Sequence, residues 1–409
     1  MSESGHLMTS SANEHMPEEI RVLVTGGGTG GHVSPALAVI EELRRQSDHC
    51  HWTLKFLYVG SEGGVERELA GASNVPFTAI RTGKLRRSAS ILGLFTKKNV
   101  LDLVQVPLGI LQASGIIKRF RPTVVFSTGG YVSVPAVVAA GRAHIPVLVH
   151  EQTVQIGLAN RITAKYASAL ALSFDGTQDL LSVSNRRKAF ISGNPVRRVI
   201  FNGSPRNAVL QCGFSSEDDG MPTVYVTGGA QGSHVINEAV KQCLPELLRE
   251  CRIMHQCGVQ PSAEIQDVVA LMEAREMLPE SLKRRYFVTE FVKHEIGDFY
   301  ALADILVSRS GAGTVAEAAA LGKPAVYVPL VPTGGDEQSK NAARFSEIGA
   351  AVVIKQSECS GTKLMETIRP LLDNPDLRRD MGTKAMQLSR PNAAVLLTQR
   401  LLQLAKLAN

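Results

Sequence analysis

The sequence predicts an α/β protein built from two doubly wound domains of similar size. The main observation is a repeat: Val22–Val33 recurs as Val224–Val235, with eight of twelve positions identical at an offset of 202 residues. Each copy passes from β-branched residues through glycines into a helical pattern, which is how a βαβ unit begins. A chain of 409 residues can bury two large cores, and the opening recurs halfway along it.

Short apolar runs, of the length of buried parallel strands, follow each opening. In the first half they are Leu54–Val59, Thr123–Phe126, Val147–His150 and Ala169–Leu172. In the second half they are Thr223–Val226, Ile253–His255, Ile305–Val307, Ala325–Val328 and Ala351–Ile354. Helical patterns lie between the runs and are clearest at Pro35–Leu43, Ile236–Leu244, Ala301–Ala303, Val315–Leu321 and Ser339–Glu347. This alternation predicts one parallel sheet in each half.

Changes in composition indicate the domain boundaries. Residues 1–19 are polar and lack the apolar core of a signal peptide, so we expect a disordered tail. The first domain is predicted to span residues 20–195 and the second 196–375, joined near Gly193–Asn207, which is rich in Gly, Pro, Asn and Arg. Residues 376–409 predict one or two helices with no strand after them.

The overall composition excludes several classes of protein. Hydrophobic residues make up 44% and charged residues 20%, which is ordinary globular usage and excludes a disordered chain, a collagen and a coiled coil. The six cysteines form no C-x-x-C pair, so we expect reduced thiols and no zinc or iron–sulfur site. The longest weakly charged stretch, Asn99–Ile117, contains Asp102 and Pro107 and is too interrupted to span a membrane. We expect a soluble or peripheral protein.

Glycine-rich turns predict the binding of phosphate groups. Gly26–Gly31 has five glycines in six positions, Gly228–Gly232 repeats the turn, and Ser310–Thr314 is a third. Glycine lets the backbone approach a ligand closely, and a helix N-terminus behind it offers N–H groups to an anion. One such loop in each half favours two phosphate-bearing substrates over simple tight turns. The first loop also fits G-x-G-x-x-G, and Glu62 stands near the place of a ribose-binding acid, so a nicotinamide oxidoreductase is an alternative.

Single polar residues near these loops are candidates for chemistry. His32 could act as a general base or bind a phosphate, and only one of His32 and its repeat-mate His234 need be functional. Arg197, at the domain junction, could pair with a diphosphate. Glu317 follows the third loop by one helical turn and could accept bonds from both ribose hydroxyls. For each residue the alternative is an ordinary capping, packing or solvent contact.

Two polar segments follow predicted strands directly. His150–Thr153 ends a strand of the first half, and Asp336–Asn341 follows a strand of the second. Ligands of open α/β sheets bind at the carboxyl ends of strands, and amide and carboxyl groups suit sugar hydroxyls. The alternative for both is a polar helix cap.

The segment 81–121 is both basic and apolar. It has nine basic residues and one acid, so its net charge is +8, against +6 for the whole chain. Such a segment suits an anionic membrane surface. The candidate membrane patch is Lys84, Arg86, Arg87, Leu94, Phe95, Lys97 and Lys98. Nucleic acid is a competing partner, but aromatic residues that could stack on bases are nearly absent. A solvated helix pair packed on its own domain is the remaining alternative.

Seven motifs in order resemble the MurG family of peripheral membrane N-acetylglucosaminyltransferases. They are Gly26–His32, Ser127–Ser133, His150–Gln152, Gly193–Arg197, Gly228–Gly232, Ser310–Glu317 and Asp336–Ala342. The resemblance covers the chain from about Arg21 to the C-terminus. It implies a GT-B fold, in which two Rossmann-like domains face each other across a cleft and the last helix crosses back to the first domain.

The resemblance also implies a reaction. N-acetylglucosamine would pass, with inversion and without metal or cofactor, from UDP-N-acetylglucosamine to undecaprenyl-pyrophosphoryl-N-acetylmuramoyl-pentapeptide (lipid I). The products would be lipid II and UDP, in peptidoglycan synthesis. The enzyme would lie peripherally on the cytoplasmic face of the bacterial inner membrane. Its partners would be both substrates, the anionic membrane surface and, as further candidates, cell-wall and division proteins, but not nucleic acid.

Site residues are carried over from the motifs as what the resemblance implies. The donor-binding residues would be Thr29, Gly30, Gly31, Thr153, Arg197, Ala230, Gln231, Gly232, Ser233, Val292, Ala312, Gly313, Thr314, Glu317 and Gln338. Within this set, Glu317 resembles the ribose-binding acid, and Val292 the position whose backbone recognises uracil. Acceptor and cleft residues would be Gly28, Tyr131, Glu151 and Gln152, with His32 as the candidate base.

Three positions depart from the family pattern. Thr153 stands where an Asn is usual, Ala230 where a Ser is usual, and Gly313 where the residue is commonly bulkier. Each change removes a donor, a hydroxyl or local rigidity, so donor affinity is the property we expect to differ. Two alternatives to lipid I transfer therefore stay open. One is a GT-B enzyme acting on another lipid, such as diacylglycerol, and the other is a catalytically weak UDP-sugar-binding scaffold of the division machinery.

Overall fold

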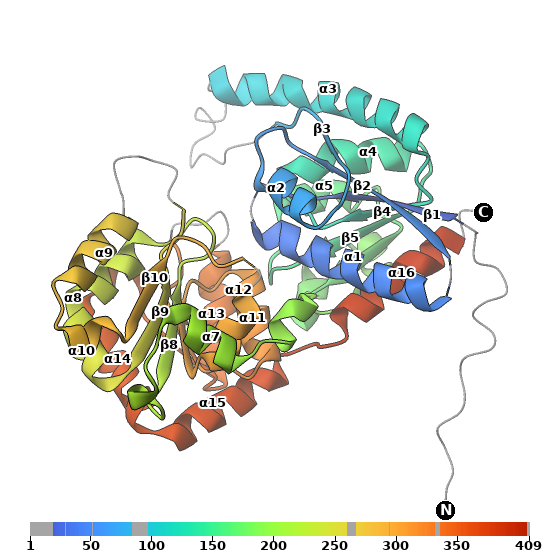
Figure 1. The fold of residues 1–409 in the computed structure, drawn as a ribbon. Coiled ribbons are helices and arrows are strands. Elements are labelled where there is room, and N and C mark those ends of the chain that lie inside the picture. Colours follow the sequence, from blue (N-terminus) through green and yellow to red (C-terminus); the bar gives the residue numbers. More distant parts are fainter. Residues whose placement is uncertain are drawn as a thin grey trace, which may run out of the picture. The chain divides into compact units, whose positions relative to one another are not determined.

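The computed structural model describes residues 19–28, 30–50, 52–83, 97–259, 267–293, 295–331 and 336–406. The chain divides into two compact units (Figure 1). The first comprises the residues up to 151 together with 156–192 and 394–409, and the second comprises 152–155 and 193–393. Each unit is a parallel sheet with helices on both faces, so the prediction of two doubly wound α/β domains is confirmed. Of the expected tail, only Glu19 is described, and it begins the first strand.

The described part of the first unit has a seven-stranded parallel sheet in the order β3-β2-β1-β4-β5-β6-β7. Its strands are β1 (Glu19–Thr25), β2 (Thr53–Gly60), β3 (Phe77–Ala79), β4 (Val124–Ser127), β5 (Val147–Glu151), β6 (Ala169–Leu172) and β7 (Ala189–Ile191). Val24 of β1 pairs with Tyr58 on one side and with Phe126 on the other. The strand order reverses between β1 and β4, and ligands of open α/β sheets bind beside the carboxyl ends of strands at such a switch point.

Helices cover both faces of this sheet. They are α1 (Gly30–Cys50), α2 (Val65–Ala72), α3 (Lys97–Phe120), α4 (Val134–Arg142), α5 (Leu158–Thr163), α6 (Val183–Arg186) and α16 (Ala393–Lys406), with 3₁₀ turns η2 (Tyr131–Ser133) and η3 (Asp175–Leu180). Because side chains alternate along a strand, Val22 and Val24 share a core with α1 and α16, whereas Leu23 shares one with α3 and α4.

The described part of the second unit has a six-stranded parallel sheet in the order β10-β9-β8-β11-β12-β13. Its strands are β8 (Thr223–Thr227), β9 (Arg252–Gln256), β10 (Tyr286–Thr289), β11 (Ile305–Ser308), β12 (Ala325–Tyr327) and β13 (Ala351–Val353). Here the order reverses between β8 and β11. The two sheets therefore place their repeated strands, β1 and β8, at equivalent positions.

Helices cover the second sheet in the same way. They are α7 (Pro205–Cys212), α8 (His234–Glu250), α9 (Asp267–Glu276), α10 (Glu280–Lys283), α11 (Ile296–Leu302), α12 (Ala312–Ala320), α13 (Glu337–Glu347), α14 (Gly361–Asp373) and α15 (Pro375–Gln387), with 3₁₀ turns η4 (Arg198–Phe201), η5 (Ser216–Asp218) and η6 (Gln356–Glu358). Val224 and Val226 pack with α8 and α14, whereas Tyr225 packs with α11, α12 and α13.

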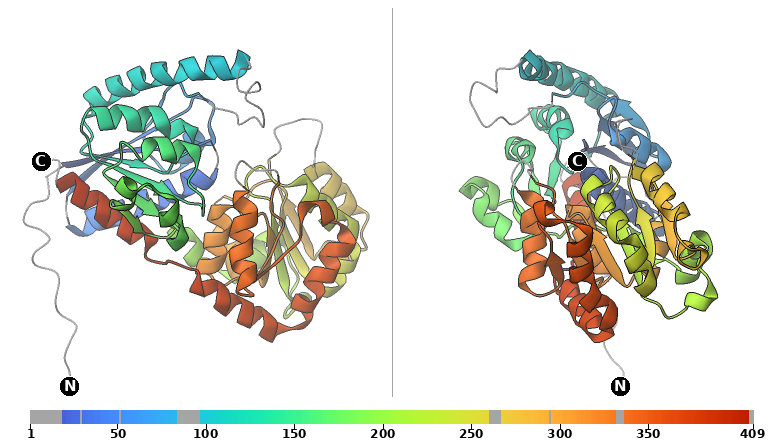
Figure 2. Two further views of the ribbon diagram at one scale, coloured as in Figure 1. Left: turned by 180° about the vertical axis from the view of Figure 1, so that it is seen from behind. Right: turned by 90° about the vertical axis from the view of Figure 1, so that its left-hand side faces the viewer.

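The last helix belongs to the first unit. After α15 the chain leaves the second unit, and α16 lies beside α1 (Figures 1 and 2). Leu397, Leu401 and Leu404 of α16 are buried in the core that holds Val22 and Val24. The first unit is therefore completed by residues from the far end of the sequence.

All the strands predicted from apolar runs are present. Three further strands, β3, β7 and β10, were not predicted, and each lies at an edge of its sheet. Their residues are mostly half-buried, and their apolar runs are short, as in Ala189–Ile191.

Candidate active site

Two glycine turns meet at the switch point of the first sheet. β1 leads into Gly26–Gly28, and β4 leads into Thr128–Gly130. The N–H of Gly27 donates to the carbonyl of Gly129 over 3.3 Å, and a Cβ on Gly26 or Gly130 would collide with the opposite turn. The lack of side chains is therefore what lets the two backbones touch. Because α1 begins directly after the first turn, its N–H groups and positive dipole end lie at this edge of the sheet.

His32 and Tyr131 flank the first turn. His32 Nδ1 lies 2.9 Å from the carbonyl oxygen of Thr128. A carbonyl only accepts hydrogen bonds, so Nδ1 carries the proton, and the neutral ring has Nε2 as its basic nitrogen. The Tyr131 ring lies over Gly28, where a Cβ would be 2.8 Å from Cε1. The structure thus brings these predicted residues together, with Gly30 and Gly31 opening α1, while Thr29 lies outside the described residues.

The predicted segment after β5 is buried and held by its own hydrogen bonds. Oε2 of Glu151 accepts from the N–H of Gly157 and from Nδ2 of Asn160, both over 2.9 Å. The Thr153 hydroxyl donates to the Gln155 carbonyl over 2.5 Å, and Gln152 is buried. These contacts stabilise the turn. One carboxylate oxygen of Glu151 and the hydroxyl of Thr153, which were both expected to face a ligand, therefore bond within the protein.

The second glycine loop takes the equivalent place in the second sheet. It follows β8, and the Ser233 hydroxyl caps α8 by accepting from the N–H of Ile236 over 3.4 Å. Gly229 and Gly232 have φ values of 84° and 72°, which favour glycine. The predicted Ala230–Ser233 therefore forms a turn at a helix N-terminus. Ala312–Thr314 begins α12 after the neighbouring strand β11, so both loops lie at one switch point.

Glu317 and Arg197 form the charged part of the second-unit site. Oε2 of Glu317 accepts from the Tyr300 hydroxyl over 2.9 Å. Burial raises the pKa of the Glu317 carboxyl, while the Arg197 charge and the Tyr300 hydrogen bond lower it. The Nε of Arg197 is buried and has no hydrogen-bond partner among the described residues. A carboxylate can accept hydrogen bonds from ribose hydroxyls, and a guanidinium beside it can pair with a diphosphate.

Gln256 bonds to two of the candidate donor-site segments, and the sequence did not reveal it. It ends β9, its Nε2 donates to the Gly229 carbonyl over 3.1 Å, and its Oε1 accepts from the Val292 N–H over 3.2 Å. The N–H of Val292, expected to recognise uracil, therefore already has a partner in this structure. Gln256 stands at a strand end next to β8, which is the one signal that could have identified it.

Gln338 lies between two loops of the second unit. Its Oε1 accepts from the Leu330 N–H over 2.9 Å, and its carbonyl accepts from the Ser310 hydroxyl over 2.8 Å. Asn341, one turn later in α13, donates to the Ser310 carbonyl over 3.0 Å. The loops after β11 and β12 are thus tied to the first turn of α13.

The repeat-mate His234 has a different partner from His32. Its Nδ1 lies 2.7 Å from Asp267 Oδ1, and Asp267 Oδ2 accepts from Asn237 Nδ2 over 2.6 Å. Oδ1 of Asn237 lies 3.0 Å from Nε2 of His255, whose pKa is lowered to about 3 by burial. His234 therefore begins a buried polar network, which is consistent with a structural role.

Most of the predicted membrane patch lies outside the described residues. This holds for Lys84, Arg86, Arg87, Leu94 and Phe95, whereas Lys97 and Lys98 begin α3. In the described part of α3, Leu111 is 70% exposed, and Lys118 and Arg119 are exposed near its end. No described helix is both long and apolar enough to cross a bilayer.

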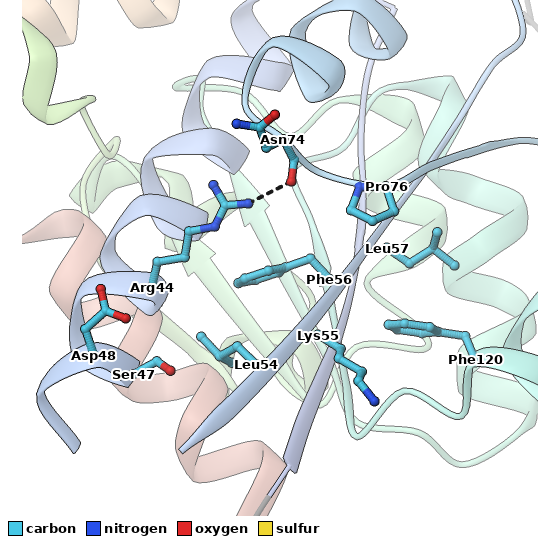
Figure 3. Close-up of a pocket in the computed structure, with 10 residues that line it drawn as sticks. All are labelled: Arg44, Ser47, Asp48, Leu54, Lys55, Phe56, Leu57, Asn74, Pro76 and Phe120. Atoms are coloured by element: carbon cyan, nitrogen blue, oxygen red, sulfur yellow. Dashed lines mark hydrogen bonds between the residues drawn. The ribbon is translucent and has the colours of Figure 1, made fainter. Parts of the chain in front are cut away.

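A surface pocket of about 570 Å³ lies in the first unit, away from the glycine turn of that unit (Figure 3). It is lined by the end of α1 and the beginning of β2, where Arg44 stands 5.5 Å over the Phe56 ring and donates to the Asn74 carbonyl over 3.0 Å. The described residues include no cluster of three or more His, Cys, Asp or Glu side chains that could hold a metal. Five cysteines, Cys212, Cys243, Cys251, Cys257 and Cys359, are free thiols.

Two parallel sheets, each with a glycine turn and a helix N-terminus at its switch point, are the architecture of the GT-B fold. Residues 22–172 match the glycosyltransferase family 28 N-terminal domain, and residues 223–397 match the C-terminal domain of the same family. The chain therefore belongs to glycosyltransferase family 28.

Curated relatives cover almost the whole chain. A UDP-N-acetylglucosamine--N-acetylmuramyl-(pentapeptide) pyrophosphoryl-undecaprenol N-acetylglucosamine transferase of Lachnoclostridium phytofermentans is 34% identical over 379 residues, 92% of this chain and 96% of the relative. The protein of the same name from Clostridium perfringens strain 13 is 32% identical over 376 residues, 91% of this chain and 95% of the relative. The chain is accordingly an N-acetylglucosaminyltransferase, and the nicotinamide oxidoreductase alternative is wrong.

Solved structures share the fold. The MurG of Acinetobacter baumannii is 26% identical with a TM-score of 0.66, covering 94% of this chain and 99% of that chain. A UDP-GlcNAc 2-epimerase from Neisseria meningitidis, bound to UDP-GlcNAc, has a TM-score of 0.63 at 14% identity, covering 94% of this chain and 100% of that chain. The second likeness concerns the fold alone.

Proposed function

We propose that the protein transfers N-acetylglucosamine from UDP-N-acetylglucosamine to lipid I, giving lipid II and UDP in peptidoglycan synthesis. The observation that carries the proposal is the pair of glycine turns, each backed by a helix N-terminus at a switch point. Each turn suits one diphosphate group, and the donor and the acceptor each carry one such group. Relatives at 32–34% identity are named for this transfer.

The second unit binds the donor in this proposal. Glu317 accepts hydrogen bonds from the ribose, and Arg197 pairs with the diphosphate. The N–H groups of Ala230–Ser233 complete the anion site. Because Gln256 occupies the N–H of Val292, uracil recognition there requires either the Val292 carbonyl or a shift of the Gln256 side chain.

The first unit binds the acceptor and supplies the base. Nε2 of His32 takes the proton of the muramoyl 4-hydroxyl while that oxygen attacks C1 of N-acetylglucosamine. The bond between C1 and the diphosphate oxygen breaks on the opposite face, so the configuration inverts and UDP leaves with the electron pair. Loop N–H groups and Arg197 stabilise the charge of the leaving diphosphate without a metal.

The location follows from the basic, apolar segment. The enzyme binds peripherally to the cytoplasmic face of the bacterial inner membrane, where its lipid acceptor is held. Exposed Leu111 on α3, with Lys118 and Arg119 near the end of the helix, supports a membrane-facing surface. Cell-wall and division proteins are further candidate partners at that surface.

The deciding experiment measures transfer of labelled N-acetylglucosamine from its UDP donor to a lipid I analogue in the presence of EDTA. We expect transfer, because no step of the proposed mechanism uses a metal. Transfer to diacylglycerol but not to lipid I would instead support a glycosyltransferase for another lipid. Saturable UDP-sugar binding without any transfer would support the scaffold alternative, and Thr153→Asn and Ala230→Ser would then test whether the departures cause it.

A further inference from the structure

A buried carboxylate lies beneath the first glycine turn. Glu66, the second residue of α2, has 0% of its surface exposed. Its Oε2 accepts from the N–H of Gly28 over 3.2 Å, and its Oε1 accepts from the N–H and the hydroxyl of Ser61 over 2.9 and 2.5 Å. A buried charge is tolerated only when hydrogen bonds satisfy it, so these contacts fix its position.

Three glycines from two connections of the chain surround the Glu66 side chain. A Cβ on Gly27, Gly60 or Gly64 would collide with the Glu66 side chain. These glycines come from the turn after β1, the end of β2 and the start of α2. Their role is to make room for the carboxylate, in addition to any room that they leave for a ligand.

Tyr58 of β2 holds the other end of the same turn. Its hydroxyl donates to the carbonyl of Gly26 over 2.7 Å, and its buried ring stacks on Phe77 with 6.1 Å between centroids. Burial, and then the charge of Glu66, raise the pKa of Tyr58. The hydroxyl therefore stays protonated and keeps donating.

We propose that Tyr58 and Glu66 are positioning residues that hold the first glycine turn in the shape that binds the acceptor diphosphate. Neither side chain is exposed, so both act through Gly26 and Gly28 rather than on the substrate. The bond from the Gly28 N–H to Glu66 directs that donor to the protein and leaves anion binding to the N–H groups at the start of α1. The inference rests on the proposed function.

Two conservative variants test the pair in the full-length protein. Glu66→Gln keeps the size but places an amide N–H against a backbone N–H, at either Gly28 or Ser61. Tyr58→Phe removes one hydroxyl and keeps the ring stack. We expect the KM for the lipid I analogue to rise about tenfold in Glu66→Gln, because a turn that keeps its binding shape in only about a tenth of the molecules lowers the apparent affinity by that factor, and by a smaller factor in Tyr58→Phe. The KM for UDP-N-acetylglucosamine should stay within about twofold.

Glu42→Gln is the matched control. Glu42 is a buried glutamate of the same unit, 4% exposed, whose partners include Arg45 and Gln46 within α1. We expect this variant to lower the melting temperature without changing the acceptor KM. If Glu66→Gln and Tyr58→Phe leave the acceptor KM unchanged, or raise both KM values equally, the pair is only structural and the inference fails. If the unmodified protein does not use lipid I, the proposed function fails instead. In that case hydrogen exchange still tests whether Glu66 holds the turn, because exchange of the Gly28 N–H should be faster in Glu66→Gln.

Discussion

Glu317 occupies a position where its charge is costly for the folded protein. Burial raises its pKa, and Arg197 and Tyr300 offset this effect only in part. Since the pKa is higher in the folded state than in the unfolded state, the folded state binds this proton more tightly. The free energy of unfolding therefore falls as pH rises from the ordinary glutamate range toward the raised pKa. The proposed contact with the ribose hydroxyls explains why a carboxylate stands there.

The variant Glu317→Gln should separate stability from binding. It removes the charge and keeps the size, so we expect a higher melting temperature at neutral pH and a smaller difference in mild acid. Affinity for UDP-N-acetylglucosamine should fall about 10–150-fold, because a hydrogen bond to a charged group contributes about 1.5–3 kcal/mol. Thermal melts at both pH values and a donor titration measure these effects. Glu358→Gln, at an exposed acid of the same unit, is the control, and identical melts for both variants would contradict the argument.

His32 and His234 occupy the same position of the repeat but have different partners. His32 Nδ1 faces a carbonyl, whereas His234 Nδ1 faces the buried Asp267. We expect His32→Ala to lower kcat by about 10²–10⁴-fold, the usual contribution of a general base, while donor affinity stays unchanged. His234→Ala should instead lower the melting temperature through the network with Asp267. A steady-state assay and donor titration decide the matter, and equal kcat losses in both variants would reject the assignment of the base.

At the scale of elements, the burial of each strand decided how well it could be predicted. β4, β5 and β8 are buried at every position, so they appear in the sequence as continuous apolar runs. β3, β7 and β10 pair on one side only and most of their residues are half-buried, so their short apolar runs give a weaker signal than a central strand does.

Helix α16 allows a direct test of its place in the first core. Leu401 is 0% exposed and Leu396 is 40% exposed. We expect Leu401→Ala to lower the free energy of unfolding by about 2–5 kcal/mol, because a large buried side chain leaves a cavity. Leu396→Ala should cost no more than about 0.5 kcal/mol. Urea unfolding of the full chain measures both, and a similar small cost for each would show that α16 adds little to that core.

Two glycines of the loops proposed to bind the donor should respond in opposite ways to alanine. A Cβ on Gly313, the second residue of α12, would meet no atom within 4 Å. Gly313→Ala should therefore stabilise the protein by about 0.5–1 kcal/mol and leave donor affinity equal or higher. Gly232 has a φ of 72°, and a Cβ there would collide with the Cys257 carbonyl. Gly232→Ala should weaken both stability and donor binding, and a gain in either would contradict the proposed loop geometry.

At the scale of the whole molecule, charge is unevenly distributed along the chain. Residues 81–121 have a net charge of +8, while the whole chain has +6, so the rest is slightly acidic. A short basic and apolar segment on an otherwise neutral protein favours orientation at an anionic surface over general adhesion to polyanions.

Vesicle binding tests this orientation when variants of two similarly exposed leucines, one in each unit, are compared. Leu111 on α3 is 70% exposed and Leu210 on α7 of the other unit is 79% exposed. We expect Leu111→Glu, and charge reversal at Lys97 and Lys98, to lower binding to anionic vesicles but to leave transfer to a short-chain, water-soluble acceptor unchanged. Leu210→Glu should change neither. Unchanged vesicle binding in the first two variants would refute the membrane assignment of the segment.

The sequence by itself determined the two parallel sheets, the glycine turns after β1 and β8, and the family motifs, because strand periodicity and glycine chemistry are local patterns. Only the tertiary structure showed that Tyr58 and Glu66 both bond to the first turn, that Gln256 joins Gly229 to Val292, and which leucines of α16 enter the first core. These contacts join elements that are distant in sequence. They depend on strand order and register, which spacing along one chain does not specify.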